Sequence, residues 1–332
     1  MRPNHITALL TLATPLLLGA QPAPRWIVGG ENDAVTSIGR IDGVAAMPRS
    51  FVVLESDAPF LKVFDYAGKL VQTLGRAGGG PGEFRSPSGM AYDAARRRLL
   101  VVDPSNARVT VYTVGDTLAA PRLLTLPEIG IRSMCTLGGR LFGLARNAPT
   151  ILRELREDNG KLTVIASFGE PRSNHPLGAH PLVRTRASDG PLLCDEPRRR
   201  IIAASAYLGE AHVFDAQTRQ QVTKPIPGFQ RITMTVDANA MTMSVPPDGF
   251  DTVRGLVLWD GAVYAVAERM RRVPNAAPES VGFALAAIGM RGPEALGARM
   301  RWRPLASTPS GSLCAQSEPA PTIAFFAAAR CP

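Results

Sequence analysis

Arginine is the residue whose abundance and spacing could do chemistry in this chain. Of the 37 basic residues, all but Lys62, Lys69, Lys161 and Lys224 are arginines, which makes 33, and the formal net charge is +9. Guanidinium groups can bind a carboxylate, sulfate or phosphate through two parallel hydrogen bonds. One arginine recurs in each of six successive units of the chain, and this set is Arg40, Arg85, Arg132, Arg186, Arg254 and Arg303.

Two interpretations of this arginine set stay open. If each member lies at the start of the innermost strand of its unit, the six would surround one mouth of a central channel and attract an anionic ligand. Alternatively the spacing is chance, because arginine is about one residue in ten here and its excess over lysine also fits a GC-rich coding sequence. We expect no nucleic-acid partner, since the chain carries features of an exported protein.

Other reactive residue types form no recognisable site. His175 and His180 lie five residues apart in a proline-rich loop, a spacing that is not a known metal-binding pattern, and His212 lies in an expected strand. The glycine-rich segment 78–82 is not followed by the Gly-Lys-Ser or Gly-Lys-Thr of a phosphate-binding loop. We therefore predict no metal and no cofactor.

A short strand pattern is repeated along the chain and must position these residues. Residues 61–114 contain it twice, with turns between the apolar runs and a glycine-rich separator at 78–82. Positions 63, 111, 154 and 213 carry the corresponding residue pairs, 48, 43 and 59 residues apart. A propeller blade takes about 40 to 50 residues.

The two copies resemble NHL-type repeats of six-bladed β-propellers. The matching positions of the second copy and of the connecting segment are Asp103, Asn106, Arg108, Val109, Val111 and Tyr112, with Gly75, Gly78, Gly80, Pro81, Gly82, Glu83, Phe84 and Pro87. The pattern decays elsewhere, since Glu55 replaces the aspartate in the first copy and Ser205 and Glu210 replace aspartate and arginine in a later one. The resemblance implies an all-β six-bladed propeller. We expect the repeat's Asp and Asn to bond backbone in their own hairpin turn.

The repeat spacing divides the chain into six units, and the two ends are expected to close the ring. The units fall near residues 40–84, 85–125, 126–170, 183–228, 230–290 and 300–326, with an insertion at 268–281. The last unit lacks a strand, whereas residues 25–28 carry strand-forming types before the first unit. We predict that this N-terminal strand completes the last blade beside residues 322–326.

The first residues read as a secretory signal. Arg2 precedes an apolar stretch, Ile6 to Leu18, and small residues follow, which predicts a signal peptide over 1–23 and a single propeller domain over 25–332. A membrane span is the alternative, but the stretch is shorter than the ~20 residues needed and Pro15 interrupts it. We expect a periplasmic or extracellular monomer without a stable membrane anchor.

The four cysteines suit an oxidising compartment, where disulfides form. Cys314 and Cys331 are the easiest pair, because a bridge there would hold the chain end. Cys135 and Cys194 each precede an expected inner hairpin turn in adjacent units, and either a disulfide or two buried thiols would fit them.

The functional prediction is an exported, non-catalytic propeller that binds a ligand or protein partner on one face, with an anion as a candidate. The alternative is a propeller lyase or hydrolase with a metal in the central channel, as in related folds. The arginine runs at 96–98 and 198–200 are interpreted as solvated charge at hairpin turns.

Overall fold

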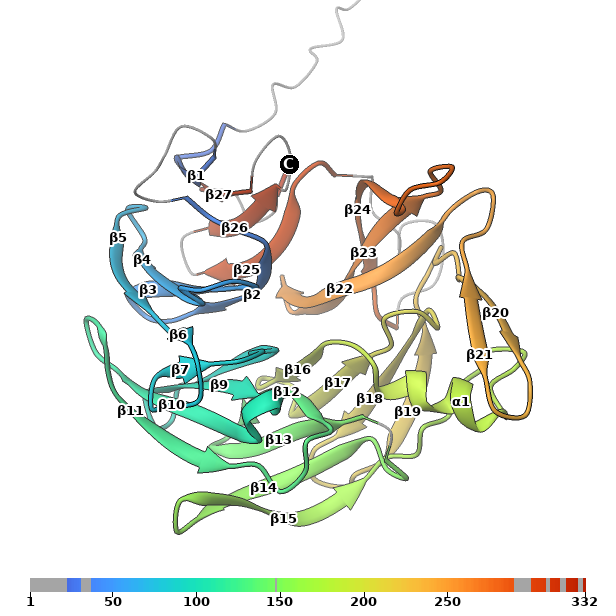
Figure 1. Cartoon of the computed structure of the whole chain (residues 1–332), viewed down its shortest axis with the longest axis horizontal. Helices are drawn as coiled ribbons and strands as arrows, with labels where there is room; N and C mark the ends of the chain where they lie inside the picture. The colour runs from blue at the N-terminus through green and yellow to red at the C-terminus, as the bar shows by residue number, and fades with distance from the viewer. Residues whose placement is uncertain are drawn as a thin grey trace, which may run out of the picture.

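The computed structural model describes residues 23–30, 37–146, 148–289, 300–308, 311–316, 321–327 and 331–332. The predicted signal peptide lies outside these residues apart from its last position. Antiparallel sheets stand side by side around a central axis, which is the arrangement of a β-propeller (Figure 1). No helix among the described residues is long and apolar enough to cross a membrane.

Three of the sheets have four antiparallel strands each. The first contains Ile41–Ala46 (β2), Ser50–Glu55 (β3), Leu61–Asp65 (β4) and Leu70–Leu74 (β5). Another contains Leu192–Asp195 (β16), Arg200–Ala204 (β17), Glu210–Asp215 (β18) and Gln221–Pro225 (β19). The closing sheet contains Arg303–Thr308 (β25), Gly311–Gln316 (β26), Thr322–Phe326 (β27) and the N-terminal strand Trp26–Gly29 (β1).

An eight-stranded sheet and a three-stranded sheet fill the rest of the ring. The larger holds Gly89–Asp93 (β8), Arg98–Asp103 (β9), Arg108–Val114 (β10), Leu118–Thr125 (β11), Ile131–Leu137 (β12), Arg140–Ala145 (β13), Leu152–Asp158 (β14) and Lys161–Phe168 (β15). Its two halves are joined only where β11 and β15 pair in parallel at Thr125 and Lys161. The smaller holds Phe250–Trp259 (β22), Ala262–Arg271 (β23) and Glu279–Ala287 (β24).

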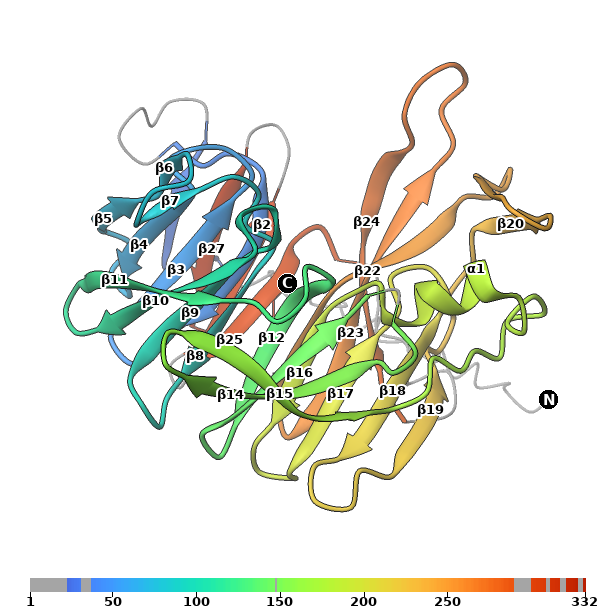
Figure 2. The ribbon, with the colours of Figure 1, turned by 60° about the horizontal axis from the view of Figure 1, so that its bottom comes forward.

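Small elements in the connections between sheets mark one face of the ring, which we call the front face. They are the parallel pair Arg76–Ala77 (β6) and Glu83–Phe84 (β7), the helix Pro181–Arg184 (α1), the 3-10 turn Thr185–Ser188 (η2) and the hairpin Thr233–Val236 (β20) with Met241–Ser244 (β21). A further 3-10 turn, Pro104–Asn106 (η1), joins β9 to β10. Figure 2 shows β6, β7, α1 and β20 on the same side of the sheets.

Apolar residues packed between neighbouring sheets hold the ring together. A sheet covered on both faces needs strands that are apolar throughout, and all six residues of β3 are buried. Each fully buried Val, Leu or Phe stabilises the fold by about 1.5 to 3 kcal/mol relative to exposure. Examples from successive sheet junctions are Leu54 with Leu99, Val102 with Ile131, Phe142 with Ile201, Ile202 with Val263, Trp259 with Phe326, and Phe325 with Phe51.

The N-terminal strand closes the ring where the sequence predicted it. β1 pairs antiparallel with β27, and Trp26 lies opposite Phe325. The indole stacks on Phe51 of β3 and on Phe325, with ring centroids 5.7 and 5.6 Å apart, and its Nε1 donates to the Tyr66 carbonyl at 2.9 Å. This strand therefore joins the first and closing sheets through both its backbone and its side chain.

The repeat motif anchors the connection that precedes its own sheet. Asp103 accepts hydrogen bonds from the backbone N–H of Arg85 and Ser86, both at 3.1 Å. Arg108 donates to the carbonyls of Gly79, Gly80 and Glu83 at 2.6 to 2.8 Å. The expectation that the repeat's Asp bonds backbone in its own hairpin turn is wrong for Asp103, because the 75–88 segment folds back over the end of β9. It is confirmed for Asp65, which accepts from the backbone N–H of Ala67 and Lys69 at 2.9 Å.

Glycine is required at two positions of the connection between β5 and β8. Gly78 has a φ of +152°, and a Cβ there would lie 2.1 Å from Glu83 Oε2. Gly75 has a φ of +81°, and a Cβ would lie 2.8 Å from the Phe84 ring. Side chains at either position would displace the residues that the Arg108 contacts hold in place.

The two disulfides expected from the sequence are both present. Cys135 in β12 is bonded to Cys194 in β16, with Cα atoms 5.6 Å apart, so it joins two neighbouring sheets. Cys314 in β26 is bonded to Cys331 near the chain end, with Cα atoms 6.0 Å apart.

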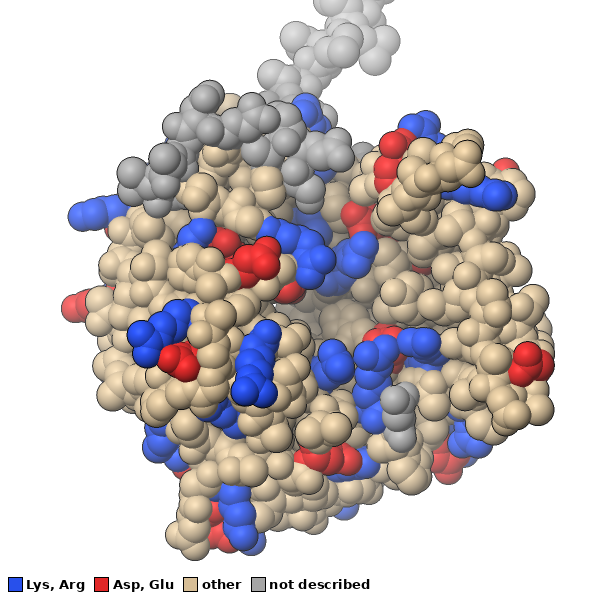
Figure 3. All heavy atoms as spheres, in the orientation of Figure 1, with Lys and Arg blue, Asp and Glu red and all other residues tan. Residues whose placement is uncertain are grey.

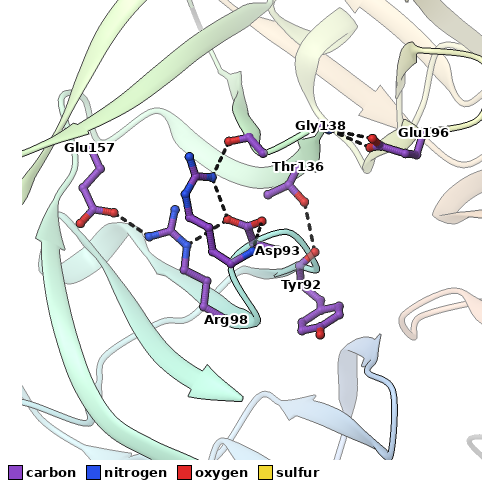
Figure 4. A network of polar contacts seen from close by, with 9 residues as sticks. Tyr92, Asp93, Arg98, Thr136, Gly138, Glu157 and Glu196 are labelled. Atoms are coloured by element: carbon purple, nitrogen blue, oxygen red, sulfur yellow. Dashed lines mark hydrogen bonds and ion pairs between the residues drawn. The ribbon is translucent and has the colours of Figure 1, made fainter. Parts of the chain in front are cut away.

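The hairpin turns on the back face are also connected by polar contacts (Figure 4). Arg98 donates to Asp93 at 3.0 Å and to Glu157 at 2.6 Å, and its side chain is only 12% exposed. The backbone N–H of Gly138 donates to the Glu196 carboxylate at 2.9 Å. The two arginine runs are thus not wholly solvated. The last arginine of each run begins the next strand and forms an ion pair with a buried aspartate: Arg98 with Asp93 in the first run and Arg200 with Asp195 in the second.

The segment 268–281, expected as an insertion, adopts strand structure at both of its ends. Its first residues end β23 and its last residues begin β24, so the segment is the end of a long hairpin. A second additional element in this part of the chain, not expected from the sequence, is the β20–β21 hairpin, which lies between β19 and β22. The short alternation of methionine and threonine in this hairpin did not indicate an added element in the sequence, whereas the charged segment 268–272 did.

Candidate functional site

The inner strands of the ring surround a cavity of about 720 Å³. Its walls come from β2, β8, β12, β16, β22 and β25, together with one residue of β23 and one of β24. Figure 3 shows the hollow at the centre of the front face, with basic side chains gathered around its rim. A concave site of this volume is in the range of small-molecule pockets.

The charged residues that line this cavity all come from one side. Its charged lining residues are Arg40, Asp42, Arg254, Glu268 and Arg303, all from the consecutive sheets of β22–β24, β25–β27 and β2–β5. We call this the charged wall. The opposite wall, from β8, β12 and β16, is neutral and is formed by Ser88, Gly89, Met90, Ser133, Met134, Gly190, Pro191 and Leu192.

Arg303 is the most enclosed cation of the charged wall. It is partly buried at the start of β25, and its Nη2 donates to the Ile41 carbonyl at 3.2 Å. Among the described residues no carboxylate lies within ion-pair distance of it. Burial lowers the pKa of Arg303; Glu268 opposes this effect, Arg254 adds to it, and Asp42 opposes it.

The two neighbouring arginines are each paired with an acid. Arg254 Nε contacts Glu268 Oε2 in an ion pair, and the Glu268 side chain is 11% exposed. Arg40 is 78% exposed, lies 3.4 Å from Asp42 and donates from Nε to Ser56 Oγ at 2.6 Å. Each of the three arginines uses one donor nitrogen, so Arg303 differs from the other two in having no ion pair among the described residues.

The structure does not bring the other three predicted arginines to the cavity wall. Arg85 is exposed and its guanidinium lies near Gly79, over the connection between the first two sheets. Arg132 is exposed in β12 but does not line the cavity. Arg186 donates to Asp189 at 2.9 Å, and Arg146 donates to the same carboxylate at 2.5 Å.

Arg85 and Arg186 lie in the connections before β8 and β16, and β-bulges interrupt four of the inner strands. The register shifts between residues 41 and 43 in β2, 131 and 133 in β12, 253 and 255 in β22, and 304 and 306 in β25. The extra residue at such a point leaves the ladder, and alternation changes side beyond it. Asp42, Arg132 and Arg254 are three such residues.

Sequence reasoning missed the acids of the site. Asp42 lies two positions after Arg40, so strand alternation could have indicated it. No sequence pattern indicated Glu268, because it reaches the cavity from β23, the second strand of its sheet. Asp189, which is shared by two arginines beside the neutral wall, also follows no motif.

Partly buried His175 and buried Glu210 lie outside the cavity lining. Burial lowers the pKa of His175, with a further contribution from Arg231. Burial also raises the pKa of Glu210, against the hydrogen bonds that its carboxylate accepts from Asn174 N at 2.7 Å and Ser173 Oγ at 3.2 Å. Within the described ranges, His, Cys, Asp and Glu side chains form no group of three or more that could hold a metal ion.

Comparison with known proteins shows the fold but no family. No family model and no curated protein sequence matches this chain. A member of the DUF4221 family from Bacteroides vulgatus superposes over 92% of this chain and 97% of its own, with a TM-score of 0.58 and 9% identity. U3-55K superposes over 91% and 98%, with a TM-score of 0.51 and 8% identity.

A structural genomics protein of unknown function from Bacteroides thetaiotaomicron superposes over 90% of this chain and 73% of its own, with a TM-score of 0.50 and 12% identity. At such identities only the arrangement of the sheets is shared.

Proposed function

We propose that this protein is an exported, non-catalytic β-propeller that binds a small organic anion in its central cavity, from the front face. The observation that carries the proposal is Arg303, a partly buried guanidinium in the cavity wall with one hydrogen bond and no ion pair among the described residues. An unpaired cation in a low-dielectric wall is unfavourable by itself and binds an anion strongly.

The two walls indicate the kind of anion. The charged wall offers guanidinium donors, whereas the neutral wall offers Met90, Met134, Pro191 and Leu192. A carboxylate attached to an apolar body would satisfy both walls at once. An inorganic anion would contact only the charged wall.

We propose six blades for the ring, with the NHL-like motif as a stabilising device in its second blade. The single parallel pairing between β11 and β15 supports treating the eight-stranded sheet as two blades of four. The Arg108 and Asp103 contacts support a structural role for the motif residues. The proposed domain spans residues 25–332 as one monomeric propeller.

Export is part of the same proposal. Both disulfides are consistent with it, because such bonds persist in the periplasm or outside the cell. The predicted signal peptide over 1–23 would direct the chain there.

The alternative, a lyase or hydrolase with a metal in the channel, has less support from the cavity. Its acids Asp42 and Glu268 are each paired with an arginine. A carboxylate whose oxygen is already engaged by a guanidinium is less available to take a proton from a substrate or to bind a metal.

Calorimetry with three probes tests the binding proposal. Octanoate has both an anionic group and an apolar body, acetate has only the charge, and octylammonium has the same body with the opposite charge. We expect octanoate to bind more tightly than acetate and octylammonium not to bind. Binding should weaken as the salt concentration rises.

The Arg303→Gln variant should weaken octanoate binding about 10-fold or more, because a hydrogen bond to a charged group contributes about 1.5 to 3 kcal/mol. Arg85→Gln is the matched control on the same face and should bind octanoate like the parent protein. Equal binding of octanoate and octylammonium, or full binding by Arg303→Gln, would refute the proposal.

A further inference from the structure

The β20–β21 hairpin carries three thioethers on one side. Met234 lies directly opposite Met243, and Met241 lies opposite Val236. Because side chains alternate along a strand, these four residues share a face. The threonines and serine of the other face are exposed, whereas Met234 is 7% exposed and Met241 and Met243 are partly buried.

A fourth thioether packs against the same cluster. Met270 of β23 joins the three hairpin methionines in an apolar group that also contains Val183 of α1. Figures 1 and 2 both show the hairpin beside α1 at the edge of the molecule, away from the closing sheet. None of these residues lines the central cavity.

Methionine is not concentrated in this way in the other described cores. Met47 and Met90 belong to one cluster, Met134 to another, and Met300 to a third. Opposed residues of an antiparallel pair have Cβ atoms about 4.5 to 5.5 Å apart. Met234 and Met243 form such an opposed pair, Met241 is the diagonal neighbour of Met234, and Met270 packs against the same cluster, so the long, unbranched side chains can approach one another.

The chemistry of the sulfurs identifies a ligand. All four cysteines are in disulfides, so methionine supplies the soft sulfur ligands among the described residues. Soft thioethers select Cu(I) over hard divalent cations. We propose that Met234, Met241, Met243 and Met270 form a site for a soft monovalent cation of the Cu(I) type at the edge of the front face.

Nearby histidine is not part of the proposed site. His180 caps α1 through Nδ1, which accepts from the Leu182 backbone N–H at 3.3 Å. A neutral ring whose Nδ1 accepts carries its proton on Nε2, so neither nitrogen has a lone pair to give a metal. The thioethers alone supply the ligands.

Titration with Ag(I), a redox-stable probe of Cu(I) sites, tests the proposal on the mature protein. Calorimetry should give one Ag(I) per chain. In spectra of protein labelled at the methionine methyl groups, the signals of the four site methionines should shift by one equivalent, while those of Met47 and Met300 should not. Anaerobic competition with bicinchoninate should show that Cu(I) binds to the same site.

Paired variants separate coordination from packing. Met241→Leu with Met243→Leu keeps the side-chain volume and the fold, because Leu and Met exchange at small cost. This variant should lose at least 10-fold in Ag(I) affinity, and the matched Met47→Leu with Met300→Leu control should keep it. Absence of binding, or equal binding by both variants, would show that the methionines only fill the core.

Discussion

Replacement of His212 by leucine should reduce the loss of stability of this protein at acidic pH. His212 is fully buried in β18, and burial lowers its pKa from the ordinary 6.5 to about 4. Its Nδ1 lies 3.2 Å from Gln221 Nε2, and both amide atoms of Gln221 are held by the Glu170 backbone. Nδ1 therefore accepts a hydrogen bond and Nε2 carries the proton, buried without a partner among the described residues.

The sign and size of the effect follow from the two pKa values. Below pH 6.5 the unfolded chain binds a proton at His212 while the folded chain does not, so stability falls as the pH drops from 6.5 towards 4. The full difference corresponds to about 3 kcal/mol, because one pKa unit is about 1.4 kcal/mol. At pH 7 this linkage has no effect, and by about pH 4.5 most of the loss has occurred.

Urea unfolding between pH 7 and pH 4.5 measures this contribution. Carboxylates such as Glu154 and Glu157, whose pKa values are lowered by arginine partners, also lose stabilisation as the pH falls. The informative quantity is therefore the difference between variants. The parent protein should lose about 2 to 3 kcal/mol more than His212→Leu over this range.

Thr223→Val is the matched control, because it removes a polar neighbour at 3.1 Å from His212 Nδ1 but keeps the imidazole. It should retain the pH dependence of the parent, whatever its stability at pH 7. Parallel pH profiles for the parent and His212→Leu would refute the argument that this buried ring stays neutral.

Two further predictions concern the ring itself. Arg108→Lys should lower the free energy of unfolding by about 2 kcal/mol, because an ammonium cannot reproduce the guanidinium contacts to three carbonyls. The control Arg122→Lys, at an exposed position, should change the free energy of unfolding by less than about 0.5 kcal/mol. Similar values for the two variants in urea titrations would contradict the anchoring role of Arg108. Trp26→Ala should lower the free energy of unfolding by about 2 to 4 kcal/mol through lost stacking on Phe51 and Phe325, whereas Ile27→Ala, at a side chain 52% exposed, should be nearly neutral. Equal melting temperatures for the two variants would show that the Trp26 stacking does not stabilise the closure of the ring.

The sequence by itself determined the local parts of this protein. Turns and connections impose requirements at fixed chain offsets, so Gly75, Gly78, Asp103 and Arg108 could be read in order as one repeat. The closing strand and both disulfides were also predictable, because an incomplete final unit and paired cysteines beside corresponding turns each call for a partner.

Only the tertiary structure decided which side chains share a site. Arg40, Arg254 and Arg303 meet because three consecutive sheets bring their inner strands together, while bulges at Asp42, Arg132 and Arg254 reset the side that each strand presents. A single-residue shift exchanges the two faces of a strand, and no local pattern in this sequence marks where that shift occurs. The methionine site likewise depends on a hairpin folding onto α1 and β23, which are distant in the chain.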